Sequence, residues 1–177
     1  HADMYTDMAI LPANYDLWAE KGVQTDPFPE RLNVPYTSLL WEAIHKTGGA
    51  ADYVTELILK DAKIQNGKIT FGKKSYGVLF LPGVKSLGVE TAKKLHEFVQ
   101  QGGKLICIET TPSKSLGFKD MQARDQEVQT WMQKIKALGS NFVFVEKPVD
   151  NKFLEWYQSF HQEQKLPKYV KISEPNR

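Results

Sequence analysis

The segment from Tyr76 to Thr111 constrains the fold more than any other part of the chain. Its sequence, YGVLFLPGVKSLGVETAKKLHEFVQQGGKLICIETT, has two apolar runs, Val78–Leu81 and Leu105–Ile108, on either side of a helical pattern. This order predicts a strand, a crossover helix and a second strand parallel to the first. Neither run alternates with polar residues, which indicates strands that are covered on both faces.

The rest of the chain repeats this alternation of strands and helices. Short apolar runs predict further strands at Met8–Leu11, Asp52–Val54 and Phe142–Val145. Helical patterns separate the predicted strands, at residues 36–44, 89–99, 128–138 and 153–160. Because crossovers are right-handed and cover both faces, the alternation predicts a doubly wound, three-layer α/β sandwich with a mainly parallel, five-stranded, flavodoxin-like sheet.

A small β-hairpin is expected beside this sheet, near residues 63–71. Ile64 and Ile69 flank Asn66-Gly67, and Asn-Gly is the dipeptide that most favours a tight hairpin turn.

Two loops stand where a site is expected, because ligands of such folds bind outside the carboxyl ends of the strands. Residues 12–33 have no clear period and contain Pro27 and Pro29, which predicts a long ordered loop. Residues 109–122 form the second loop. The helix after the first loop is expected to begin at Asn33, with Pro35 in its first turn.

Composition excludes several function classes. The chain has 177 residues, of which 41% are hydrophobic and 25% charged, as in an ordinary globular domain. The net charge of +2 is too small to predict binding to nucleic acid or to an anionic membrane. No apolar run approaches the roughly 18–20 residues of a membrane span. A single cysteine excludes an internal disulfide and a multi-cysteine metal site.

The α/β domain is expected to occupy residues 1–165, and residues 166–177 to form a linker or strand that leads into a following domain. The chain begins at His1 without a signal-peptide pattern, and it ends in LPKYVKISEPNR, a strand-like run followed by Pro175. Both ends look cut, which favours a module of a longer protein.

Few residues show a pattern that predicts chemistry. The glycine fingerprints of dinucleotide and phosphate binding are absent, so no cofactor is expected. His1, His45, His96 and His161 have no paired spacing, so no metal site is expected. Cys107 lies two residues before the end of its strand, which favours a buried core position over an exposed nucleophile.

The candidates for an interface or a ligand site are Asn14, Tyr15, Asp16, Trp18 and Glu109. Tyr15 and Trp18, beside two polar residues, could stack on a sugar or pack against a neighbouring domain, because aromatic platforms with polar rims suit both roles. Glu109 ends the fourth predicted strand and could act as an acid or base. No second carboxylate has a spacing that places it opposite Glu109, and no catalytic residue is predicted.

The segment LFLPGV…LHEFVQQGGKLICIE resembles the class I glutamine-amidotransferase-like fold. That fold also occurs as an accessory domain of glycoside hydrolases, including the trimerisation domain of family 42 β-galactosidases. In the amidotransferases the corresponding strand ends in a Gly-x-Cys-x-Gly elbow. Here that segment is Ile106-Cys107-Ile108-Glu109-Thr110, so Glu109 stands near the nucleophile position and Cys107 is out of register. This departure argues against amidotransferase activity.

Several motifs together resemble glycoside hydrolase family 106, the α-L-rhamnosidases. They are MAILPANYDLW, LLWEAIHKTGGAADYV, ITFGKKSYGVLFLPGVKSL, LHEFVQQGGKLICIE and KYVKISEPNR. The resemblance implies a large bacterial enzyme, secreted or periplasmic, whose paired carboxylates and calcium ion lie in a separate (β/α)8 barrel. No barrel motif occurs here, so no catalytic residue carries over.

The resemblance thus implies a non-catalytic accessory domain for interdomain packing or assembly. Its partners would be neighbouring domains of the same parent chain, with carbohydrate as a further candidate. Two alternatives stay open: an amidotransferase-like enzyme that uses Cys107, and an independent flavodoxin-like domain that binds a small molecule.

Overall fold

The structure, a computed structural model, describes residues 5–21 and 36–170 and contains a five-stranded parallel sheet in the order β2-β1-β6-β7-β8. The strands are β1 (Met8–Ile10), β2 (Ala51–Tyr53), β6 (Val78–Pro82), β7 (Lys104–Ile108) and β8 (Phe142–Val145). Strand β1 lies between β2 and β6, which are the next two strands of this sheet along the chain, as in flavodoxin-like folds. The predicted doubly wound α/β fold is therefore confirmed.

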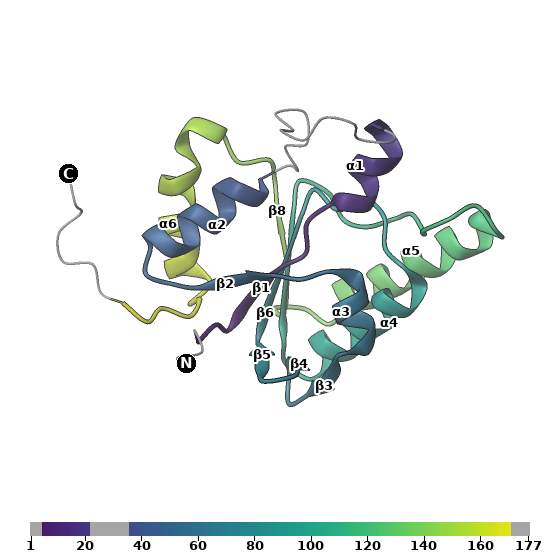
Figure 1. Cartoon of the computed structure of the whole chain (residues 1–177), viewed down its shortest axis with the longest axis horizontal. Coiled ribbons are helices and arrows are strands. Elements are labelled where there is room, and N and C mark those ends of the chain that lie inside the picture. The colour runs from purple at the N-terminus through teal and green to yellow at the C-terminus, as the bar shows by residue number, and fades with distance from the viewer. Residues whose placement is uncertain (1–4, 22–35, 171–177) are drawn as a thin grey trace.

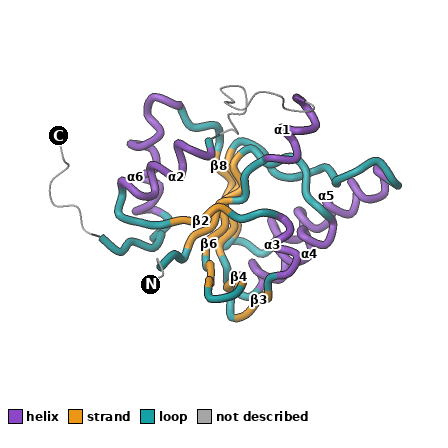
Figure 2. Tube along the Cα trace, in the orientation of Figure 1, coloured by secondary structure: helices purple, strands orange, loops and turns teal. Residues whose placement is uncertain are grey.

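Two layers of helices cover the sheet, as Figures 1 and 2 show. On one face lie α2 (Thr37–Lys46) and α6 (Phe153–Glu163), the latter preceded by a short 3-10 turn at Asp150–Lys152. On the other face lie α3 (Glu56–Asp61), α4 (Val89–Gln100) and α5 (Met121–Ala137). The sheet is therefore the middle layer of a three-layer sandwich.

Side chains of the central strands alternate between the two layers. In β6, Leu79 and Leu81 pack with α4 and α5, whereas Phe80 packs with α2 and α6. The neighbouring strand continues the pattern, because Leu79 is paired with Leu105 and Phe80 with Ile106. All of these side chains are fully buried. A strand covered on both faces must be apolar throughout, which explains the unbroken apolar runs in the sequence.

The predicted hairpin is confirmed, and it belongs to a three-stranded antiparallel sheet of β3 (Lys63–Gln65), β4 (Lys68–Phe71) and β5 (Lys74–Tyr76). Its turn residues Asn66 and Gly67 have φ of 52° and 69°, as a two-residue hairpin turn requires. The sequence YGVLFL favours a third parallel strand that starts at Tyr76, but the structure starts it at Val78. Tyr76 instead ends β5, and its side chain fits the apolar pattern of the sequence because it too is buried in the core.

The expectation of a long irregular loop at 12–33 is wrong for residues 14–21, which form helix α1 (Asn14–Lys21). The helix starts directly after β1, and the Asn14 N–H donates to the Pro12 carbonyl oxygen. None of its side chains is fully buried, so the sequence lacks the apolar stripe that predicts a helix. Residues 22–33, with the expected helix start at Asn33 and Pro35, lie outside the described residues.

The segment after α6 packs on the domain before the described residues end. Leu166 is buried in the core with α2 and α6. The backbone N–H groups of Tyr169 and Val170 both donate to the Gly48 carbonyl oxygen. At least the first part of the predicted linker therefore contacts the α/β domain, while residues 171–177 lie outside the described part. In the described ranges no helix is both long and apolar enough to cross a bilayer.

The turn from α4 into β7 needs glycine at two successive positions. Gly102 has φ of 101° and its N–H donates to the Val99 carbonyl oxygen, which is the left-handed helix end that glycine favours. A Cβ at Gly103 would lie 2.1 Å from the ring of Phe98, which is fully buried. The ring cannot move aside without disturbing the core.

Replacing Gly103 with alanine should therefore lower the free energy of unfolding by about 1–3 kcal/mol, the usual cost of overpacking. Gly77→Ala is the matched control, because a Cβ at Gly77 has nothing within 4 Å and its φ is not positive. The free energy of unfolding of Gly77→Ala should be within about 1 kcal/mol of that of the original chain. Urea unfolding of both variants measures the difference, and equal stabilities would contradict the packing at Gly103.

Candidate functional site

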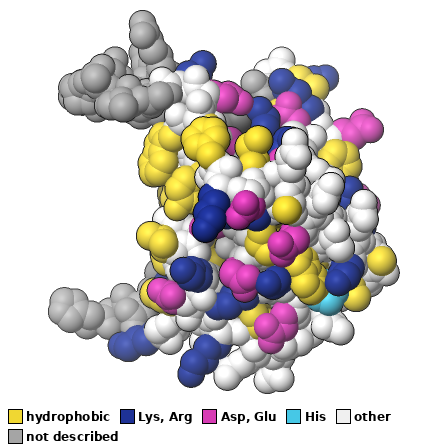
Figure 3. Space-filling view, turned by 90° about the vertical axis from the view of Figure 1, so that its right-hand side faces the viewer, with side chains coloured by type: hydrophobic (Ala, Val, Ile, Leu, Met, Phe, Trp, Pro, Cys, Tyr) yellow, Lys and Arg dark blue, Asp and Glu magenta, His cyan; other side chains and the backbone are white. Residues whose placement is uncertain are grey.

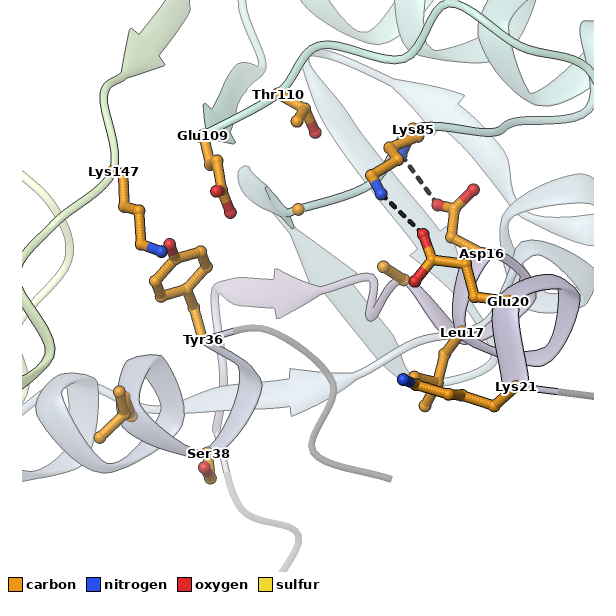
Figure 4. A pocket seen from close by; sticks show the side chains of 13 residues that line it. Asp16, Leu17, Glu20, Lys21, Tyr36, Ser38, Lys85, Glu109, Thr110 and Lys147 are labelled. Atoms are coloured by element: carbon orange, nitrogen blue, oxygen red, sulfur yellow. Dashed lines mark hydrogen bonds and ion pairs between the residues drawn. The ribbon is translucent and has the colours of Figure 1, made fainter. Parts of the chain in front are cut away.

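A hydrogen-bonded clamp joins α1 to the loop after β6. Oδ2 of Asp16 accepts hydrogen bonds from the backbone N–H groups of Lys85, at 2.8 Å, and Ser86, at 3.2 Å. Nζ of Lys85 forms an ion pair with Oε1 of Glu20 at 2.8 Å (Figure 4). The clamp therefore bridges the carboxyl ends of β1 and β6.

The clamp stands at the point where ligands bind in open α/β sheets. The chain turns from β1 toward β2 on one side and from β6 toward β7 on the other, so β1 and β6 flank the topological switch point. In nucleotide-binding relatives of such folds, backbone N–H groups at this place hold an anion. Here the carboxylate of Asp16 takes the N–H groups of Lys85 and Ser86.

The ion pair favours the charged form of both of its members. The hydrogen bond from Lys85 is the main reason that the pKa of Glu20 is lowered. The same bond raises the pKa of Lys85, and the charges of Asp16 and Glu109 add to that rise. The side chains of Lys85 and Glu20 are each 55% exposed, so solvent screens the pair. It serves to orient α1 more than to stabilise the fold.

A polar cavity of about 560 Å³ opens beside the clamp, at the carboxyl edge of the sheet. Figure 4 shows the side chains around it. Among the described residues, the charged lining comes from α1 and from the loops after β6, β7 and β8. It is balanced in sign, with three carboxylates (Asp16, Glu20 and Glu109) and three ammonium groups (Lys21, Lys85 and Lys147). The larger apolar side chains of its lining are Leu17, Leu39 and Tyr36.

Glu109 enters the cavity from a strained backbone. Its φ is 70°, and the Thr110 N–H donates to the Ile108 carbonyl oxygen at 2.9 Å, which closes a three-residue turn around Glu109. The Glu109 N–H donates to the Val145 carbonyl oxygen, and the Thr110 hydroxyl donates to the Val84 carbonyl oxygen, so neighbouring elements hold the turn. Such a backbone costs on the order of 1–3 kcal/mol, and residues of this kind gather at functional sites.

Two substitutions should measure this strain. Glu109→Gly and Glu109→Ala both remove the carboxylate, but only glycine removes the Cβ that disfavours positive φ. We expect the glycine variant to be the more stable by about 1 kcal/mol, although glycine is the less stable of the two at ordinary positions. Thermal and urea unfolding of both variants check the order, and an alanine variant at least as stable as the glycine variant would show that the turn is unstrained.

A second, apolar hollow of about 140 Å³ lies on the other side of α1. Its rim carries three large side chains in partial contact with solvent: Tyr15, Trp18 and Leu57 are 38%, 54% and 66% exposed. The rings of Tyr15 and Trp18 contact each other edge to face, with 5.6 Å between their centroids. Figure 3 shows hydrophobic side chains gathered at the upper left of the face that it presents.

The structure divides the predicted candidates between these two hollows. Asn14, Tyr15 and Trp18 border the apolar hollow, and Glu109 lines the polar cavity. Asp16 lies between them and lines both. The five candidates therefore share one edge of the sheet but do not form one site.

Sequence reasoning missed the lysines of the polar cavity, two of which follow strand ends. Lys85 and Lys147 stand three and two residues after the ends of β6 and β8. Because the carboxyl ends of parallel strands meet at one edge of a sheet, this position after a strand was the available signal. Leu57 was missed as well, since a single apolar residue in a short helix gives no sign of exposure.

Cys107 is buried in β7, as predicted from its place inside the strand. It is 0% exposed and packs between the sheet and the helices α4 and α5. Burial raises the pKa of its thiol to about 12, so the sulfur stays protonated at neutral pH. A protonated, enclosed thiol is not a nucleophile.

The histidines of the described residues lie away from both hollows. His45 stacks on Trp41, His96 packs on Trp131, and His161 is buried beside Tyr157. Across residues 5–21 and 36–170, no three His, Cys, Asp or Glu side chains gather as a metal site would require.

Comparisons with protein-family models, with curated proteins and with solved structures found no match to this chain. The geometry of the two hollows and the sequence motifs therefore carry the functional interpretation.

Proposed function

We propose that the chain is a non-catalytic accessory α/β domain of a multidomain glycoside hydrolase that resembles the α-L-rhamnosidases. The domain packs against a neighbouring domain of the same parent chain, beside a separate catalytic barrel. The sequence motifs supply the type of parent enzyme and, with it, a periplasmic or extracellular location. The exposed aromatic pair on α1, Tyr15 and Trp18, is the observation that carries the packing role.

The surface around this pair has the chemistry of an interface. Tyr15, Trp18 and Leu57 surround an apolar hollow that can accept a side chain from another domain. Contiguous exposed apolar surface marks interaction sites, and tryptophan and tyrosine dominate the binding energy at protein interfaces. The edge-to-face contact between the two rings limits their freedom before binding, which lowers the entropic cost of association.

The clamp supports the same role by fixing α1 on the domain. Because α1 buries no side chain completely, its position depends on the bonds of Asp16 and Glu20 to the loop after β6. A helix fixed in this way presents Tyr15 and Trp18 in one orientation, and such a preformed surface binds at lower cost than a mobile one.

The carboxylates also fit a non-catalytic domain better than a glycosidase. Glycoside hydrolysis usually needs two carboxyl groups on opposite sides of the scissile bond. Asp16 and Glu20 already accept hydrogen bonds from the loop after β6. Glu109 is then the cavity carboxylate that has no hydrogen bond or ion pair within the described part of the chain.

Flavodoxin-like binding of a small molecule is the second candidate, favoured by the strand order and by the cavity at the switch point. It ranks lower as a nucleotide or flavin site, because Asp16 already takes the N–H groups that such a phosphate would need. An amidotransferase that uses Cys107 is disfavoured by the burial of the thiol.

Hydroxyl-radical footprinting of the parent protein tests the packing role. We expect oxidation of Tyr15 and Trp18 to be slower in the parent protein than in the 177-residue chain, because a neighbouring domain covers both rings. Phe118 is the internal control: it is 94% exposed and lines neither hollow. Its oxidation should be the same in both proteins.

Equal oxidation of Trp18 in the two proteins would contradict the packing role.

A separate assay tests the absence of catalysis. The 177-residue chain should leave aryl α-L-rhamnosides intact, and turnover by this chain alone, lost in Glu109→Gln, would replace the proposal with an enzymatic one.

A further inference from the structure

The polar cavity has properties that the packing role does not explain. It lies on the opposite side of α1 from the aromatic pair, and the described residues of its walls include three acidic and three basic side chains. The bonds of the clamp use Asp16, Glu20 and Lys85. The side chains of Glu109 and Lys147 line the same cavity and make no hydrogen bond or ion pair to another described side chain or backbone group.

The backbone at Glu109 indicates that its carboxylate has a use. A positive φ is strained for any residue with a Cβ, and glycine would relieve it. The position instead carries a long charged side chain that reaches into the cavity, as Figure 4 shows. Strained residues that persist beside a cavity at the end of a central strand are typical of ligand sites.

The charge balance restricts the class of ligand. An anion in the cavity would face the carboxylates of Asp16, Glu20 and Glu109, and a cation would face Lys21, Lys85 and Lys147. A neutral molecule meets neither repulsion, provided that its own groups can both donate and accept hydrogen bonds. Hydroxyl groups do both, so they can pair with carboxylates and with ammonium groups alike.

The apolar part of the lining also favours a neutral ligand. Leu17, Leu39 and Tyr36 offer contact to C–H groups beside the charged groups of the lining. A sugar has apolar C–H faces and several hydroxyls around its ring, and a volume of about 560 Å³ is in the ordinary range for small-ligand sites. A zwitterion such as an amino acid could pair with Glu109 and Lys147, so glycine serves as a competing probe in the test below.

From these features we infer that the polar cavity binds a neutral sugar, with Glu109 accepting hydrogen bonds from its hydroxyls and Lys147 donating to it. Glu109 is a binding residue here and has no part in bond cleavage. The inference does not depend on the proposed packing role, since the packing surface and the sugar site lie on different sides of α1.

Titration of the ¹⁵N-labelled chain, followed by amide chemical shifts, tests the sugar site. The probes are L-rhamnose, D-galactose and D-glucose, with inorganic phosphate, glycine and putrescine as charged or zwitterionic comparisons. We expect at least one sugar to cause saturable shifts of the amides of Lys85, Glu109 and Thr110. None of the three comparison compounds should saturate the same amides.

Matched variants connect the binding to the carboxylate. Glu109→Gln should weaken sugar binding about tenfold, as expected for the loss of a hydrogen bond to a charged group. Glu127→Gln removes the same charge from an exposed position on α5 that lines neither hollow, and binding should be unchanged. Glu109→Gly should lose binding while the chain stays folded, which separates loss of the site from loss of the fold.

The inference is overturned if no sugar gives saturable shifts, if phosphate, glycine or putrescine binds as tightly as the best sugar, or if Glu127→Gln weakens binding as much as Glu109→Gln. Footprinting of Trp18 reports on the packing surface alone, so each of the two proposals can fail without the other.

Discussion

The carboxyl edge of the sheet depends on the carboxylate of Asp16, which two backbone N–H groups after β6 hold across the switch point. This contact fixes α1, a helix that no fully buried side chain anchors. Once α1 is fixed, the edge is divided into an apolar hollow with an aromatic rim and a polar cavity of balanced charge. The position that binds a phosphate in many α/β folds is filled by the chain itself, and the two hollows lie on either side of it.

Most of the fold was predictable from the sequence because the central strands of the sheet are buried on both faces. The unbroken apolar runs of β6 and β7, separated by one helix, predict parallel strands, and the structure confirms them. The hairpin followed from Asn66-Gly67, whose positive φ values the turn requires. Helix α1 could not be predicted in this way, because a helix without a buried face leaves no apolar period in the sequence.

The candidate site was predictable in part, for a related reason. A residue such as Glu109 can be placed at the sheet edge because it directly follows a strand, and its strained turn is consistent with that position. The partners of Asp16 could not be found by spacing, since Lys85 lies 69 residues further along the chain and the contact forms only when β1 and β6 are adjacent. Tertiary contacts of this kind, rather than local patterns, separate the two hollows.

Amide hydrogen exchange at Lys85 and Ser86 tests the central role of this clamp most directly. In the original chain both amides should be protected. Asp16→Ala should speed their exchange while leaving Ile106, in the neighbouring strand β7, unchanged. Glu20→Ala, which breaks the side-chain ion pair alone, should leave both amides protected. Unchanged protection of Lys85 and Ser86 in Asp16→Ala would contradict the account, because α1 would then be held by something other than its carboxylate.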